Sequence, residues 1–252
     1  GEAQPIGFNT LQHVIWWESA LRKWFGYDAI NAQANSGGTG LGLGMADWRE
    51  ESTQFGIFGD KFYEQASGTW TDRTGSVLIN TSAVYETKTH IQGTNRYTMS
   101  GNGYGEMISW TGAGSDATAL SGSPYRFQSF DYFGSRWWGV IRKNNWGNIY
   151  GSDFTDPTSN WNDSGQIIPF KDTLYGCVSV GSWLSVVGRN SINSLEGVGD
   201  SDYNKEEKII EIGSPAHRTL AQGQFFDPQY GWVNGFYMVS WDGPVFISES
   251  RR

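Results

Sequence analysis

The chain has 252 residues, of which 38% are hydrophobic, 17% charged and 15% aromatic, with 34 Gly and only 7 Pro. This composition excludes a disordered chain and is typical of a folded one with many tight turns. The formal net charge of -8, without any Lys/Arg cluster, disfavours nucleic acids and anionic membrane surfaces as partners. The sequence has no apolar run of about 18 residues or more, so we expect no membrane insertion.

The first predicted element is a helix within residues 10–29, ended by Gly26. Its apolar stripe follows helical spacing and consists of Val14, Trp17, Leu21 and Trp24. We expect the stripe to pack on a β core, and the alternative is a contact with a partner protein or another copy of the chain. The following "NSGGTGLGLGMADW" lacks the Gly-Lys-Ser/Thr ending of a phosphate-binding loop, so it is predicted to be a linker. Residues 1–54 are therefore interpreted as a helical attachment segment.

Residues 55–252 are predicted to form a β-rich repeat domain. A similar sequence pattern occurs five times. Each copy has an aromatic residue early in one strand, a polar or Gly turn, and a second strand with Val, Ile or Met. The five segments are Asp60–Ser82, Asn95–Trp110, Ser135–Ser152, Gly181–Gly197 and Asn234–Ser250. Their leading aromatic residues are Phe62, Tyr97, Trp137, Trp183 and Phe236. The drifting spacing favours one hairpin, plus a less regular outer hairpin, in each unit.

The strand faces indicate how these units pack. Both "WLSVVG" (183–188) and "FYMVSW" (236–241) are largely apolar on both faces, whereas a sheet with one face in water alternates between apolar and polar residues. Such strands lie between two other layers, as in propeller blades. We therefore predict an all-β fold, a small β-propeller of about five blades with an N-terminal helix. The alternative is a two-sheet β-sandwich or jelly roll.

A family resemblance follows from three segments. The Gly147–Ser152 segment "GNIYGS" and the C-terminal "GPVFISES" resemble the repeats of Asp-box and similar β-propellers, found in sialidase-like proteins and phage virion proteins. The segment "SDFTDPTSNW" (152–161) has the Asp-box order of Ser, Asp, Thr and Trp, but its spacing differs and the box Gly is absent. The resemblance covers residues 55–252 and implies a fold more than an activity.

Candidate catalytic and metal sites are few. Glu106, between aromatic residues, is the best single candidate for one of the two carboxylates of a glycoside hydrolase, and its alternative is an exposed strand carboxylate. The acidic run Asp200–Glu211 partly matches the spacing of an EF-hand calcium loop, but Lys205 replaces the required Gly, so an ordinary solvated loop is favoured. We expect no metal and no cofactor. Cys177 is alone, and its apolar setting predicts a buried strand thiol.

Polar-flanked aromatic residues in turn-rich segments are the predicted ligand-binding residues. They are Trp70, Trp146, Trp161, Tyr230 and Trp232. Their rings suit stacking on sugars, and the alternative is a place in the core between blades. The sequence thus predicts a non-enzymatic recognition domain for a glycan or another cell-surface ligand, plausible in a phage tail or virion receptor-binding protein, extracellular or on a virion surface. The alternatives are a carbohydrate-active enzyme and a purely structural virion protein, and oligomers are possible.

Overall fold

The computed structural model describes residues 14–17, 20–23, 42–48, 53–66, 69–92, 95–112, 114–120, 126–142, 147–158, 161, 166–198, 202–215 and 219–250. The chain divides into two compact units, Gly1–Ala34 and Asn35–Arg252. This division precedes the boundary expected at residues 54/55, because β3 (Gly42–Trp48) pairs with β4 (Thr53–Phe58) and so belongs to the larger unit.

In the smaller unit, the predicted N-terminal helix is wrong. An antiparallel hairpin forms there, in which β1 (Val14–Trp17) pairs with β2 (Ala20–Lys23). The sequence of β1, "VIWW", consists of β-branched and aromatic residues, the types that favour strands over helices. Four consecutive apolar residues fit both the spacing of a helix and the alternation of a strand, so residue type decides between helix and strand. The proposed partner-binding helical face therefore loses its basis.

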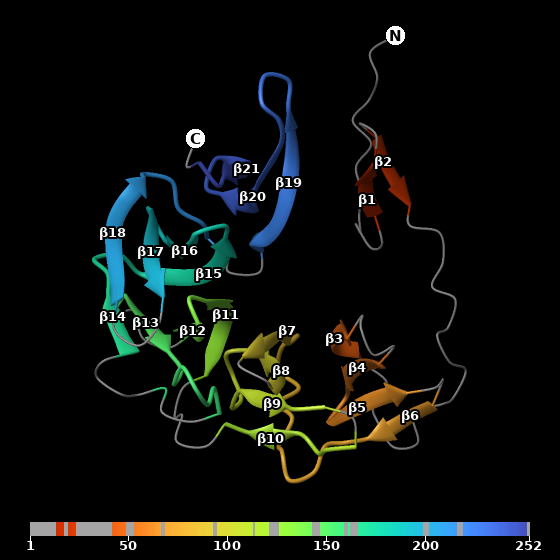
Figure 1. Ribbon diagram of the computed structural model, residues 1–252. Coiled ribbons are helices and arrows are strands. Elements are labelled where there is room, and N and C mark those ends of the chain that lie inside the picture. Colours follow the sequence, from red (N-terminus) through yellow and green to blue (C-terminus); the bar gives the residue numbers. More distant parts are fainter. Residues whose placement is uncertain are drawn as a thin grey trace. The chain divides into compact units, whose positions relative to one another are not determined.

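The described residues of the larger unit form five antiparallel sheets, each a meander in which successive strands pair (Figure 1). The first sheet contains β3, β4, β5 and β6, the last two being Lys61–Ala66 and Thr69–Asp72. The second contains β7 to β10, which are Glu86–Gln92, Asn95–Gly101, Ile108–Trp110 and Thr118–Ala119. The third contains β11 to β14, which are Phe127–Phe133, Arg136–Ile141, Asn148–Gly151 and Ile167–Pro169.

The fourth sheet contains β15 to β18, which are Leu174–Val180, Trp183–Gly188, Ile192–Val198 and Asp202–Ile210. The fifth contains β19, β20 and β21, which are Ala221–Asp227, Gly231–Ser240 and Gly243–Ser248. Among the described residues the fifth sheet has three strands, and β21, which includes Pro244, pairs with β20 alone. The all-β prediction is confirmed for the described chain. Five separate sheets do not correspond to the two-sheet alternative.

Consecutive sheets contact one another through their first strands. Contacts join β3 to β7, β7 to β11, β11 to β15 and β15 to β19. Four apolar clusters fill the spaces between successive sheets, and each draws its side chains from two neighbouring sheets or their connections. The described strands do not form a closed ring.

The recurring aromatic residues are the anchors of these clusters. Phe62, Tyr97, Trp137, Trp183 and Phe236 are all buried, with exposed fractions between 0% and 6%. Four of them lie in the second strand of their sheet, and Phe62 lies in the third strand of the first sheet. The repeat read from the sequence therefore corresponds to the second and third strands of the later sheets.

The prediction that both strand faces are buried is right for β16 and wrong for β20. Every residue of β16 is buried. In β20, Phe236 and Met238 are buried, but Tyr237 and Val239 are each 39% exposed. Trp241, in the turn that follows, is 59% exposed. No core cluster of the described residues includes Tyr237 or Val239, so this face of the strand is in water.

The acidic run also differs from its prediction. Residues Asp202–Ile210 form β18, which pairs with β17 over most of its length. An extended strand does not wrap its carboxylates around one ion, so neither the calcium loop nor an ordinary loop describes this segment. Asp200 lies outside the described residues. Among the residues that the structure covers, no cluster of His, Cys, Asp and Glu could hold a metal ion.

Candidate functional site

Exposed aromatic and aliphatic side chains gather on the fifth sheet. Of thirteen large hydrophobic residues that are exposed in the described chain, seven lie between residues 225 and 241. They are Phe225, Phe226, Tyr230, Trp232, Tyr237, Val239 and Trp241. Exposed apolar side chains concentrated on one sheet, here on both of its faces, mark an interaction site more often than chance exposure.

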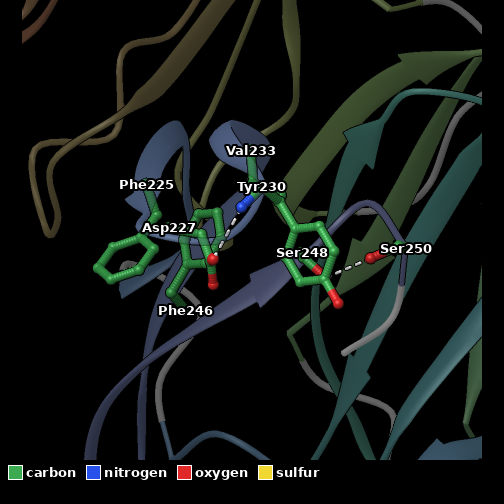
Figure 2. Close-up of a pocket in the computed structure, with 7 residues that line it drawn as sticks. All are labelled: Phe225, Asp227, Tyr230, Val233, Phe246, Ser248 and Ser250. Atoms are coloured by element: carbon green, nitrogen blue, oxygen red, sulfur yellow. Dashed lines mark hydrogen bonds between the residues drawn. The ribbon is translucent and has the colours of Figure 1, made fainter.

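A hollow of about 600 Å³ lies on the outward face of this sheet, the face opposite the fourth sheet. Figure 2 shows the side chains that line it, which come from all three strands and the adjoining turns. The lining residues are Phe225, Asp227, Tyr230, Val233, Phe246, Ser248 and Ser250. The volume falls within the range of small-molecule sites, and most of the lining is apolar.

Three rings form one side of this aromatic face. The Phe225 and Phe246 ring centroids are 5.5 Å apart, and those of Tyr237 and Phe246 are 4.9 Å apart. Two glycines make room for the rings. A Cβ added at Gly235 would lie 2.5 Å from Phe246 Cζ, and one added at Gly223 would lie 2.8 Å from Tyr237 Cε2. The rings therefore lie across bare backbone.

Polar atoms complete the hollow. Asp227 Oδ1 accepts hydrogen bonds from the backbone N–H groups of Gln229 at 2.7 Å and Tyr230 at 3.1 Å. These bonds order the turn that carries the Tyr230 ring. Ser248 Oγ and Ser250 Oγ are 3.0 Å apart at the other side of the hollow, as the dashed lines in Figure 2 show. The site thus pairs rings with one carboxylate and two hydroxyl groups.

The five predicted ligand-binding residues do not form one site. Tyr230, 58% exposed, lines the hollow. Trp232, 69% exposed, lies on the other face of the same hairpin, with its ring centroid 5.5 Å from that of Phe226. Trp70 is partly exposed in β6, against Phe58 of the first sheet.

The other two predicted residues offer no support for a surface site. Trp161 is fully buried, donates its indole N–H to Pro157 O at 2.6 Å and packs on Phe127 at 4.6 Å between ring centroids. This core role excludes it from ligand binding. Trp146 lies outside the described residues. Sequence reasoning missed four lining residues, Phe225, Asp227, Phe246 and Ser248. Alternation within "AQGQFFD" and "GPVFIS" places each pair on one face of its own strand, but only the pairing of both strands with β20 brings the two pairs together.

A second cavity, of about 360 Å³, lies at the inner strands and is polar. Its lining includes Lys88 and His90 of β7, Asp131 of β11 and Ser179 of β15. Lys88 Nζ lies 3.0 Å from Asp131 Oδ2 and 3.3 Å from a carboxylate oxygen of Glu86. The same Asp131 oxygen accepts the Ser179 backbone N–H at 2.8 Å. This chain of bonds links three consecutive sheets.

Burial and charge shift the pKa values in this cluster. Burial raises the pKa of Glu86 to about 7, although Lys88 opposes the effect. Burial lowers the pKa of Lys88, but the carboxylates of Asp131 and Glu86 outweigh it and raise that pKa. Burial also lowers the pKa of His90, against the influence of Asp131. Because the carboxylates are engaged with Lys88 and backbone, this arrangement suits a structural link more than a reaction.

The remaining candidates lie apart from both cavities. Glu106 is exposed in the connection before β9 and lines neither of them. Cys177 is buried in β15, as predicted, and burial raises the pKa of its thiol. A thiol held protonated is a poor nucleophile. The described residues contain no helix long and apolar enough to cross a membrane.

No protein-family model and no curated protein matches the chain. Several solved structures resemble it in fold, and two of them follow. The structure of BBS1N in complex with ARL6DN has a TM-score of 0.50 and 10% identity, over 82% of this chain and 64% of that one. PorZ, a bacterial surface component of the type-IX secretion system of Porphyromonas gingivalis, has a TM-score of 0.51 and 11% identity, over 84% of this chain and 26% of PorZ.

These similarities concern the fold alone. The chain spans less than two thirds of the length of either protein. Both contain β-propellers, which agrees with a chain of small antiparallel sheets that pack one on the next. Neither supports an Asp-box or sialidase relationship.

Proposed function

We propose that this chain is a non-enzymatic recognition domain of propeller type, with about five blades, that binds a glycan in the hollow on the fifth sheet. One observation carries the proposal: Phe225, Tyr230 and Phe246 surround a hollow whose polar lining is Asp227 and two serines. Aromatic faces bind the C–H faces of sugars, and carboxylate and hydroxyl oxygens bind sugar hydroxyl groups. Among the described residues no second carboxylate lines the hollow, which favours binding over glycoside hydrolysis.

The setting that we propose is an extracellular or virion surface, where a receptor-binding protein meets glycans. The support is indirect: one structure of similar fold is a bacterial surface component, and the repeat segments resemble those of phage virion proteins. Hydrolysis involving Glu106 and a purely structural virion role are the competing functions. The first predicts release of reducing sugar that Glu106→Gln abolishes, and the second predicts no ligand at all.

A glycan array, followed by calorimetry with the best ligand, tests the proposal. Phe246→Ala and Tyr230→Ala should each weaken binding tenfold or more, because each removes a ring that contacts the sugar. Leu78→Ala is the control, since Leu78 is 88% exposed and lies outside the hollow. Binding to no glycan, or equal binding by all three variants, would contradict the proposal. Trp232→Ala is a further variant that reports whether the opposite face of the hairpin contributes.

A further inference from the structure

The charge of the hollow restricts the kind of glycan that fits it. Among the lining residues that the structure describes, Asp227 is the single acidic side chain, and none is Lys, Arg or His. A sialic acid, uronic acid or sulfate group would lose water there without gaining a cation, and would meet a like charge. The net charge of -8 adds to this repulsion.

The available hydrogen-bonding atoms indicate what the sugar must offer. Asp227 Oδ1 is held by two backbone N–H groups, which fix the carboxylate in place. Among the described residues no donor contacts Asp227 Oδ2. A carboxylate oxygen accepts hydrogen bonds and cannot donate them, so its complement is a hydroxyl or amide N–H. Adjacent sugar hydroxyl groups supply such donors without bringing a charge.

The rings favour a flat, narrow ligand over a second protein surface. The rings of Phe246 and Tyr237 lie across Gly235 and Gly223, where side chains of other residues would stand upright from the sheet. A packed sheet interface interdigitates upright side chains, as the buried clusters between the other sheets do. Flat rings beside polar atoms are the arrangement that suits a pyranose ring.

From these three features we propose that the hollow selects uncharged pyranosides, neutral hexose or N-acetylhexosamine units, and rejects acidic ones. This inference rests on the proposed glycan-binding function and adds the substrate class. In the complex, one sugar ring contacts Phe225 and Phe246, while a hydroxyl or N-acetyl N–H donates to Asp227 Oδ2. The serine hydroxyl groups bind a second polar group of the same sugar.

Matched glycan pairs test the inference. Each pair has the same core, with and without a terminal sialic acid, uronic acid or sulfate, and calorimetry at neutral pH measures the affinity of the full chain. The neutral member should bind at least tenfold more tightly. Raising NaCl from about 50 to about 500 mM should change its affinity less than twofold, because no ion pair forms.

Asp227→Asn is the sharpest variant. The Asn side-chain oxygen can still accept from Gln229 N and Tyr230 N, so the turn is preserved, while the charge is lost. We expect neutral glycans to bind about three- to tenfold more weakly and the penalty for acidic glycans to shrink, since a charge-assisted hydrogen bond becomes a neutral one. Circular dichroism and the urea midpoint check that the variant folds.

The outcomes separate the two proposals. Tighter binding of acidic glycans, or a gain for neutral ones in Asp227→Asn, overturns the uncharged-sugar inference and leaves glycan recognition standing. Binding of no glycan at all overturns both. Self-association in sedimentation experiments that Phe246→Ala abolishes would identify the face as a contact between copies of the chain, and that result also overturns both.

Discussion

The fourth and fifth sheets share the same arrangement of their first strands but differ in how much of each is buried. Each has its leading aromatic residue in the second strand, Trp183 in β16 and Phe236 in β20, and both rings enter the same apolar cluster. The fourth sheet also packs on the third through Leu184 and Val186, so both faces of β16 are buried. Among the described residues, the fifth shares a core cluster with the fourth alone. The number of neighbouring sheets, rather than the hairpin itself, decides whether a face becomes core or site.

The largest effect should come from the shared cluster. Trp183 is 1% exposed and donates its indole N–H to Glu249 O at 3.0 Å. We expect Trp183→Ala to lower the free energy of unfolding by about 3–5 kcal/mol, because a large cavity forms. Trp241→Ala, on the fifth sheet, should cost less than about 1 kcal/mol. Urea denaturation followed by circular dichroism compares them, and equal losses would remove the distinction between the sheets.

A matched valine pair compares, in the fourth and fifth sheets, the face that points away from the preceding sheet. In the fourth sheet the fifth covers this face, and in the fifth sheet no described cluster covers it. Val187 in β16 is fully buried, whereas Val239 in β20 is 39% exposed. Val187→Ala should cost about 2 kcal/mol, from lost burial and a small cavity. Val239→Ala should cost less than about 0.5 kcal/mol. A large loss in Val239→Ala would mean that another surface covers this face in solution, which the urea midpoint would reveal.

The two cavities should respond differently to pH. Glu86 faces Lys88 on its own strand and Asp131 on β11, with Cys177 and His90 nearby. Because its pKa is about 7 in the folded chain against 4.5 ordinarily, the folded state binds the proton more tightly than the unfolded state does. Stability from this group is therefore fully present below about pH 4.5 and is lost as the pH rises through 7.

We expect the loss between about pH 5 and pH 8 to be about 1–2 kcal/mol for Glu86. Thermal unfolding at several pH values should show this decline in the native chain and a flatter curve in Glu86→Gln. Glycan binding should not follow it, because the hollow of the fifth sheet contains none of these groups. A parallel decline of affinity and stability would connect the two regions.

The smallest predicted effect concerns the ring packing of the fifth sheet. Tyr237 donates its hydroxyl to Gln224 O at 2.8 Å, across β19 and β20. Tyr237→Phe keeps the ring over Gly223 and removes this exposed bond, so it should cost about 0.5–1 kcal/mol. Hydrogen exchange of the β19–β20 amides is the sensitive measurement. A loss above about 2 kcal/mol would show that the bond organises the hairpin rather than assisting it.

The repeat and the all-β class could be predicted because they depend on residue type and short-range spacing. Trp137 and Trp183 recur before Gly or polar turns, and the structure places each in the buried second strand of its sheet. The N-terminal hairpin could not be predicted from spacing, because "VIWW" fits both a helix and a strand.

The candidate site was only partly predictable. Tyr230 was found by its polar neighbours, but the same criterion selected Trp161, which is in the core. Polar flanks mark a turn, and a turn can fold its aromatic residue inward or outward. Phe246 and Asp227 lie on strands that meet only after pairing through β20. A site assembled by register across three strands is not visible from local sequence.

Pro244 has a consequence for how this chain behaves at high concentration. Among the described residues β21 pairs with β20 alone, and an edge strand of this kind can act as a template for other chains. Proline has no N–H to donate, so a templated ladder would lack one bond at this position. A chain that keeps aromatic rings in water needs such protection against amyloid-like stacking. The residue that weakens this strand as a pairing partner also helps to keep the exposed aromatic face of the fifth sheet in solution.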